Sequence, residues 1–323
     1  MKIRWTLIAI SFMVLGFCCA AAAADKAVRI GITQIVEHPA LDATRQGFID
    51  ELAANGFVDG KNVLYEYKNA QNNRPVSGQI ARQLVGDKVD LILSISTPSS
   101  QDVVAVTRGI PILFSAVTDP LAAGLVKSLE SPGGNVSGTT DKSPISRQLD
   151  LLLEIAPGVK KLGTVYNSGE ASSVASVKEL EKEAAKRGIT VVRAPATSSG
   201  TVKPAAESLV GQVDAIHVPT DNTVVLAIES VVKAAQDNKI PLFAADVDSV
   251  ARGAIAALAV DYYKLGRQTG AMAHRILEGK AKVSELPVES QKELQLHINP
   301  DQAFKMGVTL PESVRKRAAR VIK

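Results

Sequence analysis

Cysteine and aromatic residues are scarce in this chain of 323 residues, which has 2 cysteines and 4% aromatic residues. Both cysteines, Cys18 and Cys19, lie near the N-terminus, so residues 25–323 contain no thiol. Their absence excludes a disulfide scaffold and cysteine redox chemistry for that part of the chain. With 46% hydrophobic residues the chain has ample material for a core, and its length favours about two domains.

Long hydrophobic runs are absent except for one at the N-terminus. There, Lys2 and Arg4 precede an apolar stretch from Trp5 to Cys19, and residues 20–24 are all alanine. A basic start, an apolar middle and an Ala-x-Ala end are typical of a secretory signal peptide, here residues 1–24. A membrane anchor is the alternative, but a span needs about 20 apolar residues.

A lipid anchor is a second alternative for this N-terminus. A lipoprotein signal has a small residue just before the acceptor cysteine, whereas the bulky Phe17 precedes Cys18 and lies two residues before Cys19. We therefore predict a soluble exported protein. Cleavage after Ala24 removes two basic residues and leaves 35 basic and 33 acidic ones. This near-neutral balance provides no excess of basic residues of the kind that binds nucleic acid.

Motifs of common enzymes are missing. The sequence has no His-Glu-x-x-His, Gly-x-Ser-x-Gly, Walker-type loop or Cys-x-x-Cys, and its four histidines show no metal-ligand spacing. We therefore expect no metal, no cofactor and no enzyme. Asp119 and Glu170 are acids of the kind that serve acid/base catalysis, but ligand contacts or helix caps are the favoured interpretation.

Short β-type runs alternate with longer helical patterns from Val28 onward. In the first half, strands are expected at 28–32, 62–67, 89–95 and 110–114, and helices from 39 toward Gly56, near 75–86 and near 98–107. Such alternation predicts an α/β fold of parallel βαβ units, with helices on both faces of the sheet.

The same pattern occurs twice. Val89–Leu93 leads through a helix to Ile110–Phe114, and Val213–His217 leads through a helix to Ile240–Phe243. We therefore predict two similar doubly wound parallel-sheet lobes that face each other across a cleft. Because no flexible Gly/Ser linker separates them, the boundary near Thr140–Pro144 is interpreted as a short hinge.

Polar side chains follow the predicted strands of both halves. In parallel α/β sheets, ligands bind beyond the carboxyl ends of the strands, near helix N-termini. The candidates are Thr33, Gln34, His38, Ser96, Thr97, Thr118 and Asp119 in the first half and Asn167, Ser168, Glu170, Ser172, Thr220, Asp221, Asn222, Asp246 and Asp248 in the second. Hydroxyls, amides and acids with few cations suit a small polar ligand that carries both a carboxylate and an amine.

Several local motifs resemble those of periplasmic substrate-binding proteins of ABC importers, in the tryptophan-binding-protein-like group with a type I periplasmic-binding fold. They are His-Pro-Ala-Leu-Asp at 38–42, Thr-Pro-Ser-Ser-Gln at 97–101, Val-Thr-Asp-Pro-Leu-Ala-Ala-Gly-Leu-Val at 117–126, Asn-Ser-Gly-Glu-Ala-Ser-Ser at 167–173, Asp-Asn-Thr-Val at 221–224, Phe-Ala-Ala-Asp at 243–246 and Asp-Tyr-Tyr-Lys-Leu-Gly-Arg-Gln-Thr-Gly at 261–270. The resemblance spans essentially all of the chain after the signal peptide.

The resemblance implies three crossings between the lobes and closure about them as a hinge. We place the crossings near 140–143, 260–262 and 285–288. The first lobe then comprises residues 25–141 and 262–285, and the second comprises residues 142–261 and 286–323.

An amino acid, with aromatic ones favoured, is the ligand class that the resemblance implies. Ser96, Thr97 and Thr118 would hold its carboxylate and Asp246 its amine. Asn167, Glu170 and Asp221 would add contacts from the second lobe, and His38 would close over the side chain. The alternative for each is a cap or turn role. The aromatic candidates for the pocket, each of which also suits a core position, are Phe114, Tyr166, Phe243, Tyr262 and Tyr263.

The expected partners are a small solute and an ABC permease and ATPase complex, and we expect a periplasmic monomer. A receptor-type sensor that presents its ligand to a membrane signalling protein remains an alternative, as do an exported enzyme and a binder of a non-amino-acid aromatic or other small carboxylate.

Overall fold

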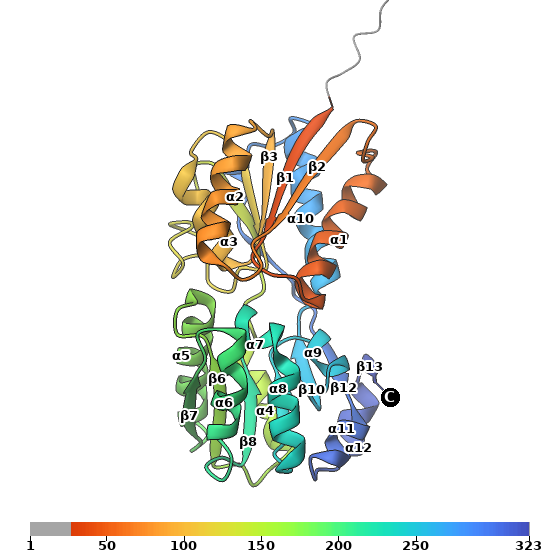
Figure 1. The fold of residues 1–323 in the computed structure, drawn as a ribbon. Coiled ribbons are helices and arrows are strands. Elements are labelled where there is room, and N and C mark those ends of the chain that lie inside the picture. Colours follow the sequence, from red (N-terminus) through yellow and green to blue (C-terminus); the bar gives the residue numbers. More distant parts are fainter. Residues whose placement is uncertain (1–26, 323) are drawn as a thin grey trace, which may run out of the picture.

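The computed structural model describes residues 27–322 and forms two lobes stacked end to end (Figure 1). The predicted signal peptide lies outside the described residues. Each lobe contains one sheet: the strand order is β11-β5-β4-β3-β1-β2 in the first and β13-β12-β10-β9-β8-β6-β7 in the second. Strands β2-β1-β3-β4-β5 and β7-β6-β8-β9-β10 follow the same order, so the predicted duplication and the α/β class are confirmed.

The first lobe is built mostly from the N-terminal half. Its strands are β1 (Val28–Gln34), β2 (Val63–Asn69), β3 (Leu91–Ile95), β4 (Ile112–Ser115), β5 (Val136–Thr140) and β11 (Glu289–Ser290), and its helices are α1 (Pro39–Ala54), α2 (Arg74–Gly86), α3 (Thr97–Val106), α10 (Tyr262–Leu277) and the 3-10 helix η1 (Val283–Glu285). All five residues of β3 are buried, as a central parallel strand covered on both faces requires.

The second lobe repeats this plan. Its strands are β6 (Lys161–Tyr166), β7 (Thr190–Pro195), β8 (Ala215–Val218), β9 (Leu242–Ala244), β10 (Ala256–Ala259), β12 (Gln295–Ile298) and β13 (Arg320–Val321), and its helices are α4 (Ile145–Ile155), α5 (Ala171–Ala185), α6 (Ser199–Ser208), α7 (Asn222–Leu226), α8 (Ile228–Asp237), α9 (Asp248–Ala251), α11 (Pro300–Lys305) and α12 (Glu312–Arg317). The pair of β10 and β12 is antiparallel, whereas β12 and β13 are parallel.

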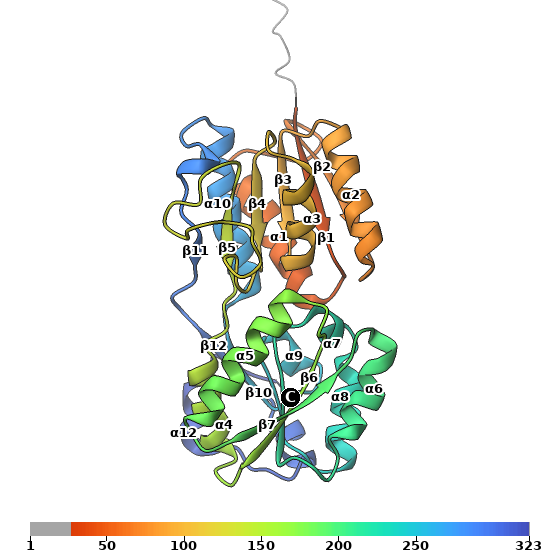
Figure 2. The same cartoon turned by 90° about the vertical axis from the view of Figure 1, so that its left-hand side faces the viewer.

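Helices α1 and α10 lie side by side on one face of the first sheet, and α2 and α3 cover the other (Figures 1 and 2). Two glycines allow α1 and α10 to approach closely. A Cβ on Gly47 would lie 2.1 Å from the carbonyl oxygen of Tyr263, and one on Gly266 would lie 2.0 Å from that of Thr44. Any larger residue would push the helices apart.

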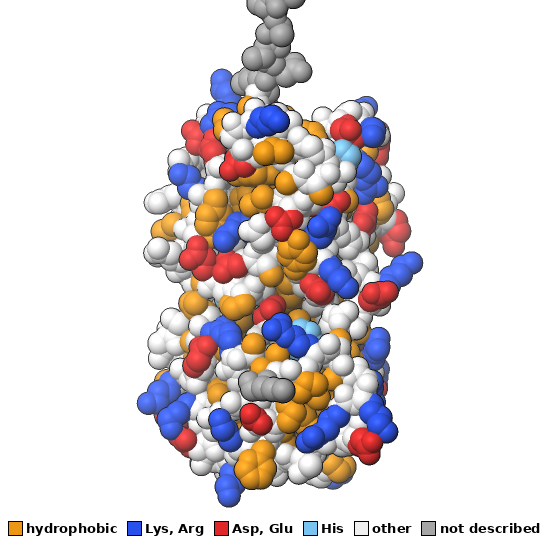
Figure 3. Space-filling view, turned by 90° about the vertical axis from the view of Figure 1, so that its right-hand side faces the viewer, with side chains coloured by type: hydrophobic (Ala, Val, Ile, Leu, Met, Phe, Trp, Pro, Cys, Tyr) orange, Lys and Arg blue, Asp and Glu red, His pale blue; other side chains and the backbone are white. Residues whose placement is uncertain are grey.

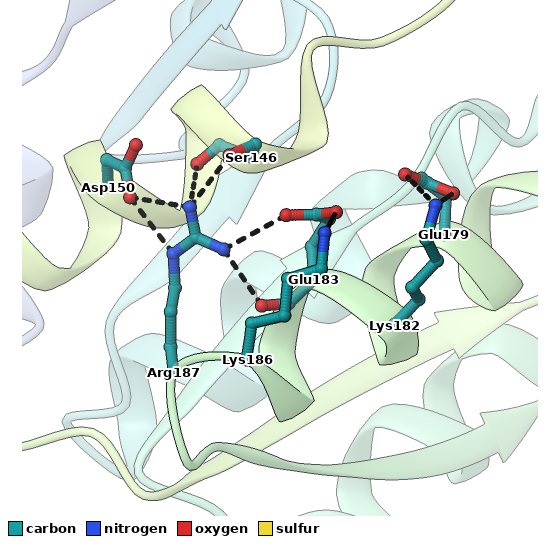
Figure 4. A network of polar contacts seen from close by, with 7 residues as sticks. All are labelled: Ser146, Asp150, Glu179, Lys182, Glu183, Lys186 and Arg187. Atoms are coloured by element: carbon teal, nitrogen blue, oxygen red, sulfur yellow. Dashed lines mark hydrogen bonds and ion pairs between the residues drawn. The ribbon is translucent and has the colours of Figure 1, made fainter.

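Arg187, just after α5, ties that helix to α4 in the second lobe (Figure 4). Its Nη2 donates to Asp150 Oδ1 at 2.7 Å and to Ser146 Oγ at 2.7 Å, and its Nη1 donates to the carbonyl oxygen of Glu183 at 2.8 Å. Because Arg187 is largely buried beneath these partners, the network fixes the position of α5.

Three crossings join the lobes. The first lies between β5 and α4 and the second between β10 and α10, both close to their predicted positions. The third comes later than the predicted 285–288: β11 still pairs with β5 in the first sheet, so the chain crosses between Ser290 and Gln295. The reason is tertiary, because a two-residue edge strand is too short to leave a hydrophobic pattern in the sequence.

Charged side chains of both signs are interspersed over the face drawn in Figure 3. No extended patch of one sign stands out on this face. Within residues 27–322, no helix has both the length and the apolar character needed to cross a membrane.

Candidate functional site

A narrow cavity lies between the lobes. Its walls come from segments that follow β1, β4 and β5 in the first lobe and β6, β8, β9 and β10 in the second, at the edge where ligands bind in doubly wound folds. The lining residues are His38, Ala40, Leu41, Ala116, Thr118, Asp141, Ser172, Thr220, Asp221, Asn222, Val225, Asp246 and Tyr262.

This lining is acidic. It includes Asp141, Asp221 and Asp246 but no Lys or Arg. The three aspartates are 3%, 2% and 4% exposed. Burial raises the pKa of the Asp141 and Asp221 carboxyls. Since a buried carboxylate without a cation costs several kcal/mol in a protein interior, the chemical complement of this cavity is a positively charged group.

Asp141 is held by two donors. Thr118 Oγ1 donates to its Oδ1 at 3.0 Å, and the hydroxyl of Tyr262 donates to its Oδ2 at 2.7 Å. Burial and the neighbouring Asp141 raise the pKa of Tyr262 well above its ordinary value, so its hydroxyl stays a donor. The pair therefore presents a positioned carboxylate beside an aromatic wall.

Asp246 and Asp221 line the cavity and also cap local structure. Asp246 accepts from the backbone N–H of Ser249 at 2.8 Å and from its hydroxyl at 2.6 Å. Asp221 accepts from the backbone N–H groups of Asn167 at 2.5 Å and Val224 at 2.8 Å. A carboxylate has about four acceptor positions, so a cap role and a ligand contact are compatible at both residues.

The N-terminus of α1 also faces the cavity. Its N-cap, His38, makes no side-chain cap bond, and Pro39 has no N–H. The backbone N–H groups of Ala40 and Leu41 belong to the first turn, which has no acceptor within the helix. Both residues line the cavity. The start of this 16-residue helix therefore offers partial positive charge and free donors to an anionic group.

Direct contacts join the two walls. His38 Nε2 lies 3.4 Å from Asn222 Oδ1, and Asn72 Nδ2 donates to Thr223 Oγ1 at 3.1 Å. His38 and Asn72 belong to the first lobe, and their partners belong to the second. The lobes are thus closed on each other in this structure.

Glu170 lies behind Asn222. Its Oε1 accepts from the Ser172 hydroxyl at 2.8 Å, from the backbone N–H of Asn222 at 3.3 Å and from Asn222 Nδ2. Burial, followed by the nearby Asp221 carboxylate, raises the pKa of Glu170 to about 8. This carboxyl therefore holds its proton near neutral pH.

Seven of the predicted site residues line the cavity: His38, Thr118, Ser172, Thr220, Asp221, Asn222 and Asp246. Another four, Asp119, Asn167, Ser168 and Glu170, line a broader open groove between the lobes. Asp119 accepts from the backbone N–H of Ala122 at 2.9 Å, as a turn cap does.

The other five predicted residues, Thr33, Gln34, Ser96, Thr97 and Asp248, line neither space. Gln34 is occupied by Val36, Asp42 and Arg45 within its own lobe. The hydroxyls of Thr33, Ser96 and Thr97 are buried without a hydrogen-bond partner among the described residues. Thr33 lies near the end of β1, and Ser96 and Thr97 follow β3, but none of the three lines the cavity.

Sequence reasoning missed Asp141 as a site residue, and it treated Tyr262 only as one of several aromatic candidates. Asp141 directly follows β5, so the same strand-end rule identifies it. Its position in the first crossing suggested a hinge role alone. Ala40 and Leu41 carry no polar side chain, and only their backbone position reveals them.

The sequence model of the ABC transporter substrate-binding protein family matches residues 29–322. The chain belongs to this family. The match covers nearly all of the described residues, so the predicted resemblance and the type I periplasmic-binding fold are confirmed.

Two relatives are similar over most of their length. A tyrosine-binding protein of Clostridioides difficile (strain R20291) is 46% identical over 276 residues, which is 85% of this chain and 80% of that protein. The crystal structure of a conserved domain protein from Vibrio cholerae is 46% identical with a TM-score of 0.90, covering 92% of this chain and all of that one.

Two further structures bear on the conformation of this substrate-binding protein. An ABC domain from Streptococcus pneumoniae in complex with L-Trp is 35% identical, and a ligand-free, open substrate-binding protein from Clostridium difficile is 44% identical. Both alignments cover 92% of this chain and all of the other. The TM-score is 0.88 to the first and 0.70 to the second. The less similar sequence thus has the more similar structure, which agrees with the closed lobes seen here.

Proposed function

We propose that this protein is the extracytoplasmic solute-binding component of an ABC importer, and that its ligand is an amino acid with an aromatic side chain. The observation that carries this proposal is the closed cavity with three buried aspartates and no Lys or Arg among its lining. An ammonium group neutralises such a site, and a sugar does not.

The ligand amine pairs with Asp246 and Asp141 in this proposal. Asp246 lies in the second lobe and Asp141 at the first crossing, so an ammonium with three donors can bridge them. Charge-assisted hydrogen bonds of this kind are about twice as strong as neutral ones. The cap interpretation of Asp246 stands beside this one, because Ser249 already occupies part of its carboxylate.

The ligand carboxylate binds at the N-terminus of α1. The backbone N–H groups of Ala40 and Leu41 supply donors and a favourable dipole there. This assignment replaces Ser96 and Thr97, whose hydroxyls lie away from the cavity lining. The hydroxyl of Thr118 serves the site indirectly, because it donates to Asp141.

The ligand side chain lies against the apolar part of the lining. Leu41, Ala116, Val225 and Tyr262 supply this surface. The tyrosine-binding relative and the L-Trp complex support an aromatic side chain, since both proteins align with most of this chain.

Closure drives binding in this account. A ligand that contacts both lobes favours the closed state by its difference in affinity for the two states. The contacts of His38 with Asn222 and of Asn72 with Thr223 form only when the lobes meet. The closed form then presents the ligand to a membrane permease after export of the chain into the periplasm.

A thermal-shift screen of residues 25–323 against the amino acids tests the ligand class. A ligand at 100 times its Kd adds about 2.7 kcal/mol to the free energy of unfolding, so we expect a rise of several degrees with L-Tyr or L-Trp. No rise with any amino acid would contradict the assignment. For import, deletion of the gene should abolish uptake of the radiolabelled ligand, whereas a sensor would leave uptake unchanged.

A further inference from the structure

His38 is held from the opposite lobe by a chain of hydrogen bonds. Glu170 Oε1 accepts from Asn222 Nδ2, and Asn222 Oδ1 faces His38 Nε2 at 3.4 Å. Glu170 Oε1 also accepts from Ser172 and from the backbone of Asn222, so it acts as an acceptor whether or not Oε2 carries a proton. The Asn222 amide therefore has its NH₂ toward Glu170 and its oxygen toward His38.

This orientation determines the tautomer of His38. Asn222 Oδ1 can only accept, so His38 Nε2 must carry the hydrogen. Burial lowers the pKa of His38, which keeps the ring neutral. In a neutral imidazole with hydrogen on Nε2, the other nitrogen is an acceptor.

That acceptor has no partner among the described residues. His38 is 8% exposed, its Nδ1 is buried without a hydrogen bond, and the residue lines the inter-lobe cavity. A helix N-cap side chain usually bonds the first turn, but His38 does not. A buried acceptor left unpaired costs about 1–3 kcal/mol, so a donor is expected there.

We propose that His38 Nδ1 accepts a hydrogen bond from a neutral donor on the ligand side chain, a phenol O–H or an indole N–H, and thereby selects these ligands over phenylalanine. The proposal rests on the proposed amino-acid-binding function and adds its specificity. The ligand ammonium has carboxylates as partners in the same cavity, since Asp141, Asp221 and Asp246 line it. The uncharged Nδ1 of His38 is therefore available to a neutral donor.

Calorimetric titration of residues 25–323 with L-Tyr, L-Phe and O-methyl-L-tyrosine provides the test. We expect L-Tyr to bind at least about tenfold more tightly than either analogue, because only L-Tyr has the phenol hydrogen. Equal Kd values for the three would overturn this inference and leave amino-acid binding in place. Binding of none of the three, nor of L-Trp, would overturn both.

The variant His38→Phe separates a hydrogen bond from shape. Loss of the contact with Asn222 weakens all ligands alike, so the ratio of the L-Phe and L-Tyr Kd values isolates Nδ1. We expect this ratio to fall to about one in His38→Phe and to keep its wild-type value in His274→Phe, a histidine on the outer part of α10 paired with Glu278. An unchanged ratio in His38→Phe would overturn the proposal.

Nitrogen-15 NMR of labelled histidine gives a readout that does not depend on the variant. The sequence has only four histidines, so the His38 signals can be assigned by substitution. We expect a neutral ring with hydrogen on Nε2, and an Nδ1 resonance that shifts when L-Tyr binds but not when L-Phe does. A ring with hydrogen on Nδ1, or equal shifts with both ligands, would contradict the assignment.

Discussion

The hydroxyl of Tyr262 donates a 2.7 Å hydrogen bond to Asp141 Oδ2 and thereby joins the second crossing between the lobes to the first. Gln291 joins the third crossing to the second in the same way: its Nε2 donates to the carbonyl oxygen of Asp261 at 2.8 Å, and its Oε1 accepts from that residue's N–H at 3.1 Å. Because Asp141 and Tyr262 also line the cavity, the hinge and the proposed ligand share one carboxylate.

Substitution of Tyr262 by Phe tests this link. The change leaves Asp141 Oδ2 buried without its donor, so we expect a loss of about 1–3 kcal/mol in the free energy of unfolding. Tyr263→Phe is the matched control, since its hydroxyl donates to Asp50 at an exposed position and should matter by less than about 0.5 kcal/mol. Urea unfolding measures both. Equal effects of the two variants would contradict the role of the hinge bond.

Asp246→Asn tests the pairing with the amine. Asparagine is as good a helix cap as aspartate, so the variant keeps the bond from the Ser249 N–H, places its Nδ2 as a donor toward the Ser249 hydroxyl and removes the charge. We expect the Kd for the amino acid to rise at least tenfold, about 1.4 kcal/mol. Asp119→Asn, which changes a cap in the open groove, should leave the Kd unchanged. An unchanged Kd in Asp246→Asn would remove this residue from the site.

Glu170 predicts a pH dependence of stability. Its pKa is raised from 4.5 to about 8 in the native state, so between these values the native state holds a proton that the unfolded state releases. This contribution to stability is fully present below the lower value and is lost as the pH rises through the higher one. We therefore expect the unfolding free energy of wild type to fall relative to that of Glu170→Gln as the pH rises from 5 to 8.

The control for this experiment is Glu154→Gln. Hydrogen bonds from Ser313 and Arg317 lower the pKa of the partly exposed Glu154, so its titration falls below that range. The difference between this variant and wild type should stay constant from pH 5 to pH 8. A constant difference for Glu170→Gln as well would contradict the raised pKa.

The close approach of α1 and α10 predicts opposite effects of two Gly→Ala changes within helices. A Cβ at Gly266 would lie 2.0 Å from the Thr44 carbonyl oxygen, so Gly266→Ala should lower the unfolding free energy by about 1–3 kcal/mol or more. At Gly78 in α2 the nearest atom is the end of the Arg82 side chain at 3.7 Å. Gly78→Ala should raise the unfolding free energy by about 0.5–1 kcal/mol. Stabilisation by both would contradict this packing.

Periodicity alone predicted most of the fold, because both halves alternate strands and helices of ordinary length. Even the burial of β3 follows from its run of apolar residues. The edge strand β11 escaped prediction: it has two residues, and only its pairing with Thr139 and Thr140 makes it a strand. The position of the last crossing depends on that pairing and is not visible in the sequence.

The sequence predicted which edge of each sheet forms the candidate site, but not which residues at that edge reach the cavity. The strand-end rule places Ser96 and Asp246 at the edge of a sheet, yet Asp246 reaches the cavity and Ser96 does not. Which of these two residues lines the cavity depends on how the two lobes pack against each other. Asp141 shows the opposite case. Its position in a crossing suggested a hinge role alone, yet it also lines the cavity.

Calorimetric titration of residues 25–323 with L-tyrosine and with 3-(4-hydroxyphenyl)propanoate, which lacks only the amine, tests the central claim most directly. L-Tryptophan and indole-3-propanoate form the second pair. If the buried aspartates hold the ammonium, at least one amino acid should bind at least about 100-fold more tightly than its analogue, since an unpaired buried charge costs 2–5 kcal/mol. Equal binding of an amino acid and its amine-free analogue would contradict the account.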